Sequence, residues 1–174
     1  LNDRGQRFQN VTMAGGFGHL QKGHGVSFAD IDNDGDQDVY VQLGGAYPGD
    51  RYNDALFENP GFDNHYIRLE LEGRKSNRNA IGARVRLDIT EANGEQRSVH
   101  HTVSSGSSFG ANPYRQVIGI GTAKKIDELH INWPLPDSSQ TFLNVAGDQS
   151  YRCAEGNELE VVELHRFRLA DQND

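Results

Sequence analysis

The chain has 174 residues, enough for one large domain or two small ones, and it carries a formal net charge of -8. No basic run or stripe occurs, which argues against a nucleic-acid partner, and no apolar run is long enough to cross a bilayer. The single cysteine, Cys153, cannot form an internal disulfide. It is either a small, partly buried residue or a bridge to another chain or segment.

Residues 1–62 predict four short antiparallel strands. Residues 7–12 alternate in polarity, residues 26–28 and 39–43 flank an aspartate-rich stretch, and residues 54–59 form a further strand that ends at Pro60. Four such strands in about fifty residues are typical of one blade of a β-propeller.

The aspartate-rich stretch, residues 30–38, holds five aspartates on alternate positions and one glycine, Gly35. Because like charges repel, this density is unfavourable unless a cation neutralises it. Alternate carboxylates of a loop can turn inward on one centre, and Gly35 permits the tight bend. Hard oxygen ligands in this number favour Ca²⁺ over Zn²⁺ or a soft metal. The alternative is a solvated acidic turn, because Asp, Asn and Gly are ordinary turn residues.

The stretch begins like an EF-hand loop, which requires a bidentate Glu at its twelfth position and a helix on each side. Counting from Asp30, the twelfth residue is Val41, and both flanks have the composition of strands. The sequence therefore predicts a calcium loop within a β-hairpin, with Asp36 contributing its backbone carbonyl. The predicted side-chain ligands are Asp30, Asp32, Asp34 and Asp38.

From residue 64 onward the strands become longer and alternate strictly. Ile67, Leu69 and Leu71 face one side, for example, while the charged residues between them face the other. Seven strands are predicted, over residues 67–72, 84–89, 99–103, 117–120, 128–133, 141–145 and 159–164, and Asn93-Gly94 supplies a hairpin turn. No segment has helical periodicity. The sequence thus predicts an all-β chain, with a propeller-type blade over 1–62 and an antiparallel β-sandwich over 63–174.

Both parts resemble known families. The run from Val26 to Val39 is similar to an FG-GAP or VCBS-type calcium-binding repeat. Residues 56–59, 64–69 and 76–85, together with Asn132-Trp133-Pro134, resemble the ASPIC/UnbV domain that usually follows such repeats. The resemblance implies a relative of the cartilage acidic protein group and its bacterial counterparts, which are typically secreted or cell-surface proteins without established catalytic residues in this domain. Residues 116–121 and 134–137 depart from the family pattern.

Two further groups of polar residues have competing interpretations. His100 and His101 lie on one strand and point to opposite faces, so they cannot share a metal, and His101 is expected to be a hydrogen-bonded core histidine. In the polar loop at residues 76–79, Asn77 and Arg78 can recognise a carboxylate or sugar hydroxyls. The alternative is that they cap strand ends and brace the loop.

The sequence therefore predicts a non-enzymatic, calcium-binding module for adhesion or binding outside the cytoplasm, secreted or at the cell surface. A protein or glycan partner would contact the sandwich loops or the propeller face, and the remaining propeller blades would lie in the same or another chain. One alternative is an accessory subunit or domain of a larger enzyme or biosynthetic complex. A second is a carbohydrate-binding module, which rests on fold analogy.

Overall fold

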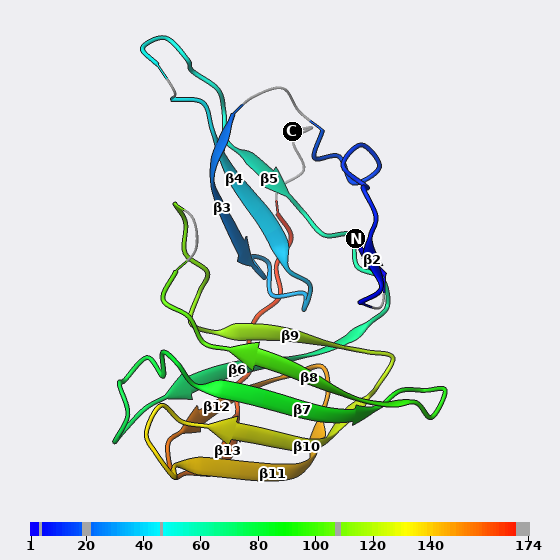
Figure 1. The fold of residues 1–174 in the computed structure, drawn as a ribbon, viewed down its shortest axis with the longest axis vertical. Coiled ribbons are helices and arrows are strands. Elements are labelled where there is room, and N and C mark those ends of the chain that lie inside the picture. Colours follow the sequence, from blue (N-terminus) through cyan, green and yellow to red (C-terminus); the bar gives the residue numbers. More distant parts are fainter. Residues whose placement is uncertain (4, 19–21, 46, 107–108, 170–174) are drawn as a thin grey trace.

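The computed structural model describes residues 1–3, 5–18, 22–45, 47–106 and 109–169. Within these ranges the chain forms thirteen β-strands and no helix, which confirms the all-β prediction. The described residues contain no helix that is long and apolar enough to cross a membrane. Figure 1 shows a small sheet standing above a larger two-layered body.

The larger body, here called the sandwich, consists of two four-stranded sheets with the orders β11-β10-β7-β8 and β13-β12-β6-β9. Its strands are β6 (His65–Glu72), β7 (Arg84–Thr90), β8 (Gln96–Thr102), β9 (Gln116–Gly121), β10 (Lys125–Asn132), β11 (Ser139–Ala146), β12 (Gln149–Ala154) and β13 (Leu159–Val161). The alternating apolar residues of both sheets meet in one core, and Ile67, Leu87 and Leu129 are among its fully buried side chains. The turn at Asn93-Gly94 joins β7 to β8, as predicted.

Two features of the sandwich differ from the prediction. Strand β12 was not predicted, because its sequence contains no β-branched residue, yet its Tyr151 and Cys153 side chains enter the core. This strand pairs with β6 in parallel, so the sandwich is not purely antiparallel. Alternation along a strand fixes which residues face the core, but it does not determine the partner strand or its direction. Cys153 is a free thiol, and burial, followed by the charge of Glu158, raises its pKa to about 11.

The smaller sheet, here called the hairpin sheet, contains β3 (Gly23–Ala29), β4 (Asp38–Leu43) and β5 (Ala55–Phe57) in sequence order. The expected fourth strand at residues 7–12 does not join it. Instead, β2 (Arg7–Phe8) pairs with β1 (Asn2–Asp3). The chain then turns at once, because the Thr12 N–H bonds to the Asn10 side chain at 3.1 Å and the Gly15 N–H bonds to the Val11 carbonyl at 2.7 Å.

The hairpin sheet has one apolar face that is only partly covered. The register places Phe28, Val39 and Phe57 side by side on this face, and Phe28 remains 42% exposed. Phe17 packs on Phe57 with ring centroids 4.7 Å apart. The sandwich reaches the edge of the sheet through Asn112, whose Oδ1 accepts the Phe28 N–H at 2.9 Å. The hairpin sheet therefore owes less of its structure to a buried apolar core than the sandwich does.

Candidate metal centre

Residues 30–38, here called the aspartate loop, connect β3 to β4 and curl around their own carboxylates. Oδ1 of Asp32 accepts the Asp34 N–H at 3.1 Å, and Oδ1 of Asp34 accepts the Asp36 N–H at 2.9 Å. Two residues adopt positive φ angles, 62° at Asn33 and 107° at Gly35, which tightens the curl. As a result, the side chains of Asp30, Asp32 and Asp34 each offer one oxygen, and these oxygens lie within 4.8 Å of one another.

The other two predicted ligands lie differently. Asp38 is 1% exposed, and its two oxygens accept the N–H groups of Ile31 at 3.0 Å and Asn59 at 2.9 Å. It therefore ties the start of the loop to the segment that follows β5. Asp36 is partly buried beside the others and is not a member of the three-carboxylate group. The structure thus brings three of the five aspartates together and uses Asp38 to close the loop.

The electrostatics of the loop reflect this crowding. Burial, followed by the negative charge of Asp34, raises the pKa of Asp32 above its ordinary value. The same two causes raise the pKa of Asp36. Both carboxylates are therefore less favourable in their ionised form than a free aspartate, so a counter-charge near them stabilises the loop.

Arg68 supplies part of that counter-charge from the sandwich. It lies on β6 with its side chain turned away from the core, yet it is only 4% exposed because the aspartate loop covers it. Its Nε donates to Oδ2 of Asp30 at 2.5 Å, and its Nη2 is in ion-pair contact with the same oxygen. The guanidinium also lies 4.6 Å from the centre of the Tyr66 ring and donates to Ser150 at 3.2 Å.

The remaining oxygen of Asp30 distinguishes this loop from an ordinary acidic turn. Asp30 is 3% exposed, and its Oδ1 is buried without a hydrogen-bond donor among the described residues. A buried carboxylate oxygen without a partner carries a large desolvation penalty. A cation coordinated by that oxygen would remove the penalty, so the donor set fits a hard metal ion.

Gly35 holds the loop directly against the sandwich. A Cβ atom built on this residue would overlap the Tyr66 ring, so only glycine permits the observed approach. The positive φ of Gly35 is a second reason for glycine at this position. The sequence predicted a bend here, but it gave no sign that the bend packs on an aromatic ring of β6.

A segment far away in the sequence crosses the same loop. After β13 the chain rises from the sandwich toward the hairpin sheet, as the red end of the ribbon shows (Figure 1). The Phe167 N–H donates to the Asp32 carbonyl at 3.0 Å, and the Asn33 side chain donates to the His165 carbonyl at 3.0 Å. Nη2 of Arg166 donates to Oδ2 of Asp34 at 3.1 Å. We call residues 163–168 the strap.

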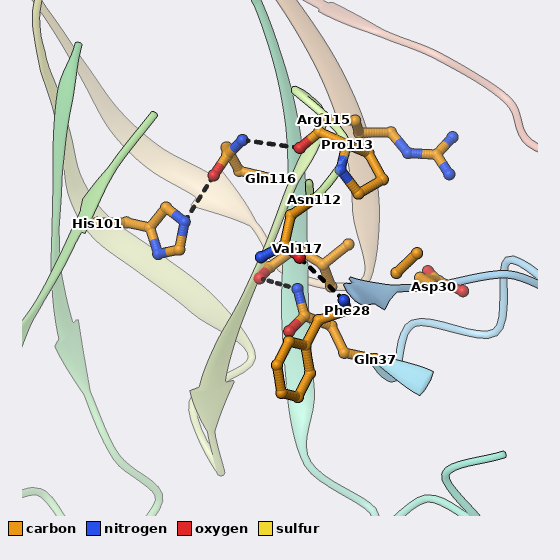
Figure 2. Close-up of a pocket in the computed structure, with 10 residues that line it drawn as sticks. Phe28, Asp30, Gln37, His101, Asn112, Pro113, Arg115, Gln116 and Val117 are labelled. Carbon is orange, nitrogen blue, oxygen red and sulfur yellow. Dashed lines mark hydrogen bonds between the residues drawn. The ribbon is translucent and has the colours of Figure 1, made fainter. Parts of the chain in front are cut away.

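A cavity of about 250 Å³ lies beside the metal centre, between β3 and the sandwich. Figure 2 shows His101 pointing toward Gln116, and the two side chains are joined at 2.6 Å. His101 is hydrogen-bonded as predicted, but it is only partly buried and lines this cavity instead of joining the core. Gln116 also donates to the Tyr114 carbonyl at 2.6 Å, so its amide fixes the residues that frame the cavity.

The polar loop at residues 76–79 lies apart from the metal centre and is internally braced. The Asn77 side chain forms two hydrogen bonds of 2.8 Å with the backbone of Ile81, while the Arg78 side chain is 86% exposed. Buried Glu155 holds the beginning of the loop, because its Oε2 accepts the N–H groups of Arg74, Lys75 and Ser76 at 2.7–3.0 Å. Asn77 thus serves the loop itself, and Arg78 is the residue that faces solvent.

The fold and this site define an all-β protein in which a carboxylate loop is seated on the side of a sandwich. Comparison with known families matches residues 73–160 to the family described as ASPIC and UnbV. The chain therefore belongs to the ASPIC and UnbV family. The match covers β7 to β12 and the first two residues of β13, and it leaves the aspartate loop and the strap outside. No curated protein matches the chain.

Proposed function

We propose that the aspartate loop binds Ca²⁺ and that the protein is a non-enzymatic binding or adhesion module whose structure the ion stabilises. One observation carries the proposal. Oδ1 of Asp30 is buried without a donor, and it belongs to a residue whose carboxylate converges with those of Asp32 and Asp34. An acidic turn that is merely solvated would expose its carboxylates to water instead.

The charge balance of the loop supports a divalent ion. The loop carries five carboxylates, whereas three guanidinium groups contact it within the described residues: Arg68 pairs with Asp30, Arg166 pairs with Asp34, and Arg115 donates to Asn33, so a negative excess remains. Oxygen ligands on a flexible loop suit the variable coordination of Ca²⁺ better than the strict octahedron of Mg²⁺. Asp30, Asp32 and Asp34 would bind the ion through their side chains, and Asp36 through its carbonyl.

The position of the loop supports a structural role for the ion. The sandwich and the strap both hold the loop. On the sandwich, Arg68 donates to Asp30 and is itself held by Ser150, and on the strap, Arg166 donates to Asp34. An ion that fixes the loop would therefore fix the hairpin sheet on the sandwich. Histidines that invite a catalytic interpretation have structural partners, as His65 has in Asp148 at 2.7 Å and His130 in Thr141 at 2.8 Å.

We further propose that the hairpin sheet is an FG-GAP or VCBS-type blade in a protein related to the cartilage acidic protein group, exported to the cell surface or secreted. Support comes from the apolar face of the sheet, where a groove of about 610 Å³ is lined by Phe17, Val39, Leu56, Phe57 and Phe62. A neighbouring propeller blade, from the same or another chain, is a partner of the right chemistry for this face.

Thermal unfolding in Ca²⁺ and in EDTA tests the proposal. At a Ca²⁺ concentration a hundredfold above the dissociation constant, binding to the folded state adds about 2.7 kcal/mol of stability. For a chain of this size we expect the melting midpoint to rise by roughly 5–10 °C. Mg²⁺ at the same concentration serves as the control and should give a smaller rise. An unchanged melting midpoint in Ca²⁺ would contradict the proposal.

A further inference from the structure

We propose that Arg166 of the strap sets the cation affinity of the metal centre, because it competes with the bound ion for the carboxylate of Asp34. The inference rests on the proposed calcium site and adds a determinant that lies 132 residues away in the sequence. It follows from how the two oxygens of Asp34 are used and from the exposure of the arginine.

Both oxygens of Asp34 accept hydrogen bonds from the protein. Oδ1 accepts the Asp36 N–H at 2.9 Å, and Oδ2 accepts Nη2 of Arg166 at 3.1 Å. A cation that takes Asp34 as a ligand must therefore displace the guanidinium or share the carboxylate with it at close range. Displacement costs the ion pair between Arg166 and Asp34, and sharing places two positive charges close to one another, so both routes weaken cation binding.

The two arginines that pair with carboxylates of the loop, Arg68 and Arg166, differ in how freely their side chains can move. The side chain of Arg68 is 5% exposed and is fixed by Asp30, Tyr66 and Ser150, so its charge is a constant part of the site. The side chain of Arg166 is 68% exposed, whereas its partner Asp34 is 12% exposed. Arg166 can therefore leave for solvent at little cost, which makes it the adjustable cation of the two.

The strap does not depend on Arg166 alone. The Phe167 N–H and the His165 carbonyl bond to Asp32 and Asn33 through groups that an arginine substitution leaves intact. The variant Arg166→Gln should therefore keep the strap in place and remove only the competing charge. The coupling is reciprocal. Bound Ca²⁺ should lower the equilibrium constant of the ion pair between Arg166 and Asp34 by the same factor by which that ion pair lowers the Ca²⁺ affinity.

Calorimetric titration of the full chain with Ca²⁺ tests the inference. We expect R166Q to bind Ca²⁺ about two- to fivefold more tightly than the wild type, as the loss of one exposed ion pair allows. The difference should shrink in 0.5 M salt, because screening weakens exposed charges, and R166K should keep the wild-type affinity. R168Q is the matched control: it removes the same charge from the same strap, and Arg168 makes no ion pair within the described part of the chain.

The outcomes separate the two proposals. Equal Ca²⁺ affinity in the wild type and R166Q, or an equal gain in R168Q, overturns the role of Arg166 and leaves the calcium site standing. Weaker binding by R166Q also overturns it and identifies the arginine as a structural clamp on the loop. Absence of heat in all variants overturns the calcium site, and the competition with it.

Discussion

The sandwich and the hairpin sheet are both built from β-strands, but different interactions stabilise them. In the sandwich, both sheets direct large aliphatic side chains into one core, where Ile67, Leu129 and Ile131 are inaccessible to solvent. In the hairpin sheet, Val41 and Leu43 are the buried aliphatic residues among those described, while Phe28 and Leu56 remain over 40% exposed. The sandwich is stabilised chiefly by apolar burial, and the hairpin sheet depends on contacts with its surroundings.

Those surroundings are mostly polar and charged. Arg68 and the strap contact the aspartate loop, and Asn112 bonds to the edge strand β3. Small sheets with a single apolar face are marginal on their own. The stability of the hairpin sheet should therefore respond to ions and salt, whereas that of the sandwich should respond to core volume.

The largest effect should follow a cavity in the sandwich. Leu129→Ala should lower the free energy of unfolding by about 4 kcal/mol, because it removes a fully buried side chain from the central strand β10. Leu143→Ala on β11, where the side chain is 66% exposed, is the control and should change it by less than about 0.5 kcal/mol. Urea denaturation followed by circular dichroism measures both. A loss of unfolding free energy in Leu129→Ala that depends on Ca²⁺ would contradict the independent stabilisation of the two regions.

A smaller effect should follow removal of the contact between the loop and β6. Gly35→Ala should destabilise the hairpin sheet by roughly 3 kcal/mol, because a Cβ atom adds backbone strain at φ 107° and overlaps Tyr66. Gly45→Ala is the matched control, since Gly45 has φ 79° and open space around its Cβ position. Native-state hydrogen exchange should show a larger loss of protection in residues 23–43 for Gly35→Ala than for Gly45→Ala, which adds backbone strain without the overlap. Equal losses in both variants would mean that backbone strain, not the Tyr66 contact, causes the effect.

The smallest effect concerns a carboxylate that needs no ion. Burial alone raises the pKa of Glu155, but hydrogen bonds from Ser76, Ser138 and the neighbouring backbone outweigh it and lower the pKa to about 2. Because the pKa is lower in the folded state, the ionised Glu155 stabilises the fold at pH values above 4.5. This stabilisation is lost as the pH falls from 4.5 toward 2. Glu155→Gln should cost about 2 kcal/mol at neutral pH.

The pH profile of unfolding checks this assignment. Below pH 4.5 the stability of the wild type should fall more steeply than that of Glu155→Gln, so that the two curves converge toward pH 2. Addition of EDTA should leave the difference between them unchanged, because Glu155 lies in the sandwich. Parallel curves across this range would contradict the role of the charge.

The sequence predicts much of the sandwich because alternation on a long strand is a strong signal. Alternation predicts the strand at residues 84–89 and the inward side of residues 67–71, and the Asn93-Gly94 pair predicts the turn between β7 and β8. Strand β12 and its parallel pairing with β6 do not, because Gln149–Ala154 lacks β-branched residues and pairing partners are set by the whole fold. Arg68 faces away from the core as its position requires, but only the structure places the aspartate loop over it.

At the metal centre, the spacing of the aspartates predicts convergence, and Asp30, Asp32 and Asp34 do converge. The spacing does not reveal that the Asp38 oxygens accept hydrogen bonds from the backbone of Ile31 and Asn59, since Asn59 lies in a different loop, after β5. The contact between Asp34 and Arg166 joins residues too far apart in the sequence for any local pattern to reveal. Local chemistry is therefore predictable here, and the long-range partners are not.

We propose that an ion in the aspartate loop holds the hairpin sheet on the sandwich, and hydrogen exchange of the wild-type chain in Ca²⁺ and in EDTA measures this. Ca²⁺ should slow exchange in β3, β4 and residues 30–38, and leave the exchange of β7 and β10 unchanged. Identical exchange in residues 23–43 under both conditions would contradict the claim.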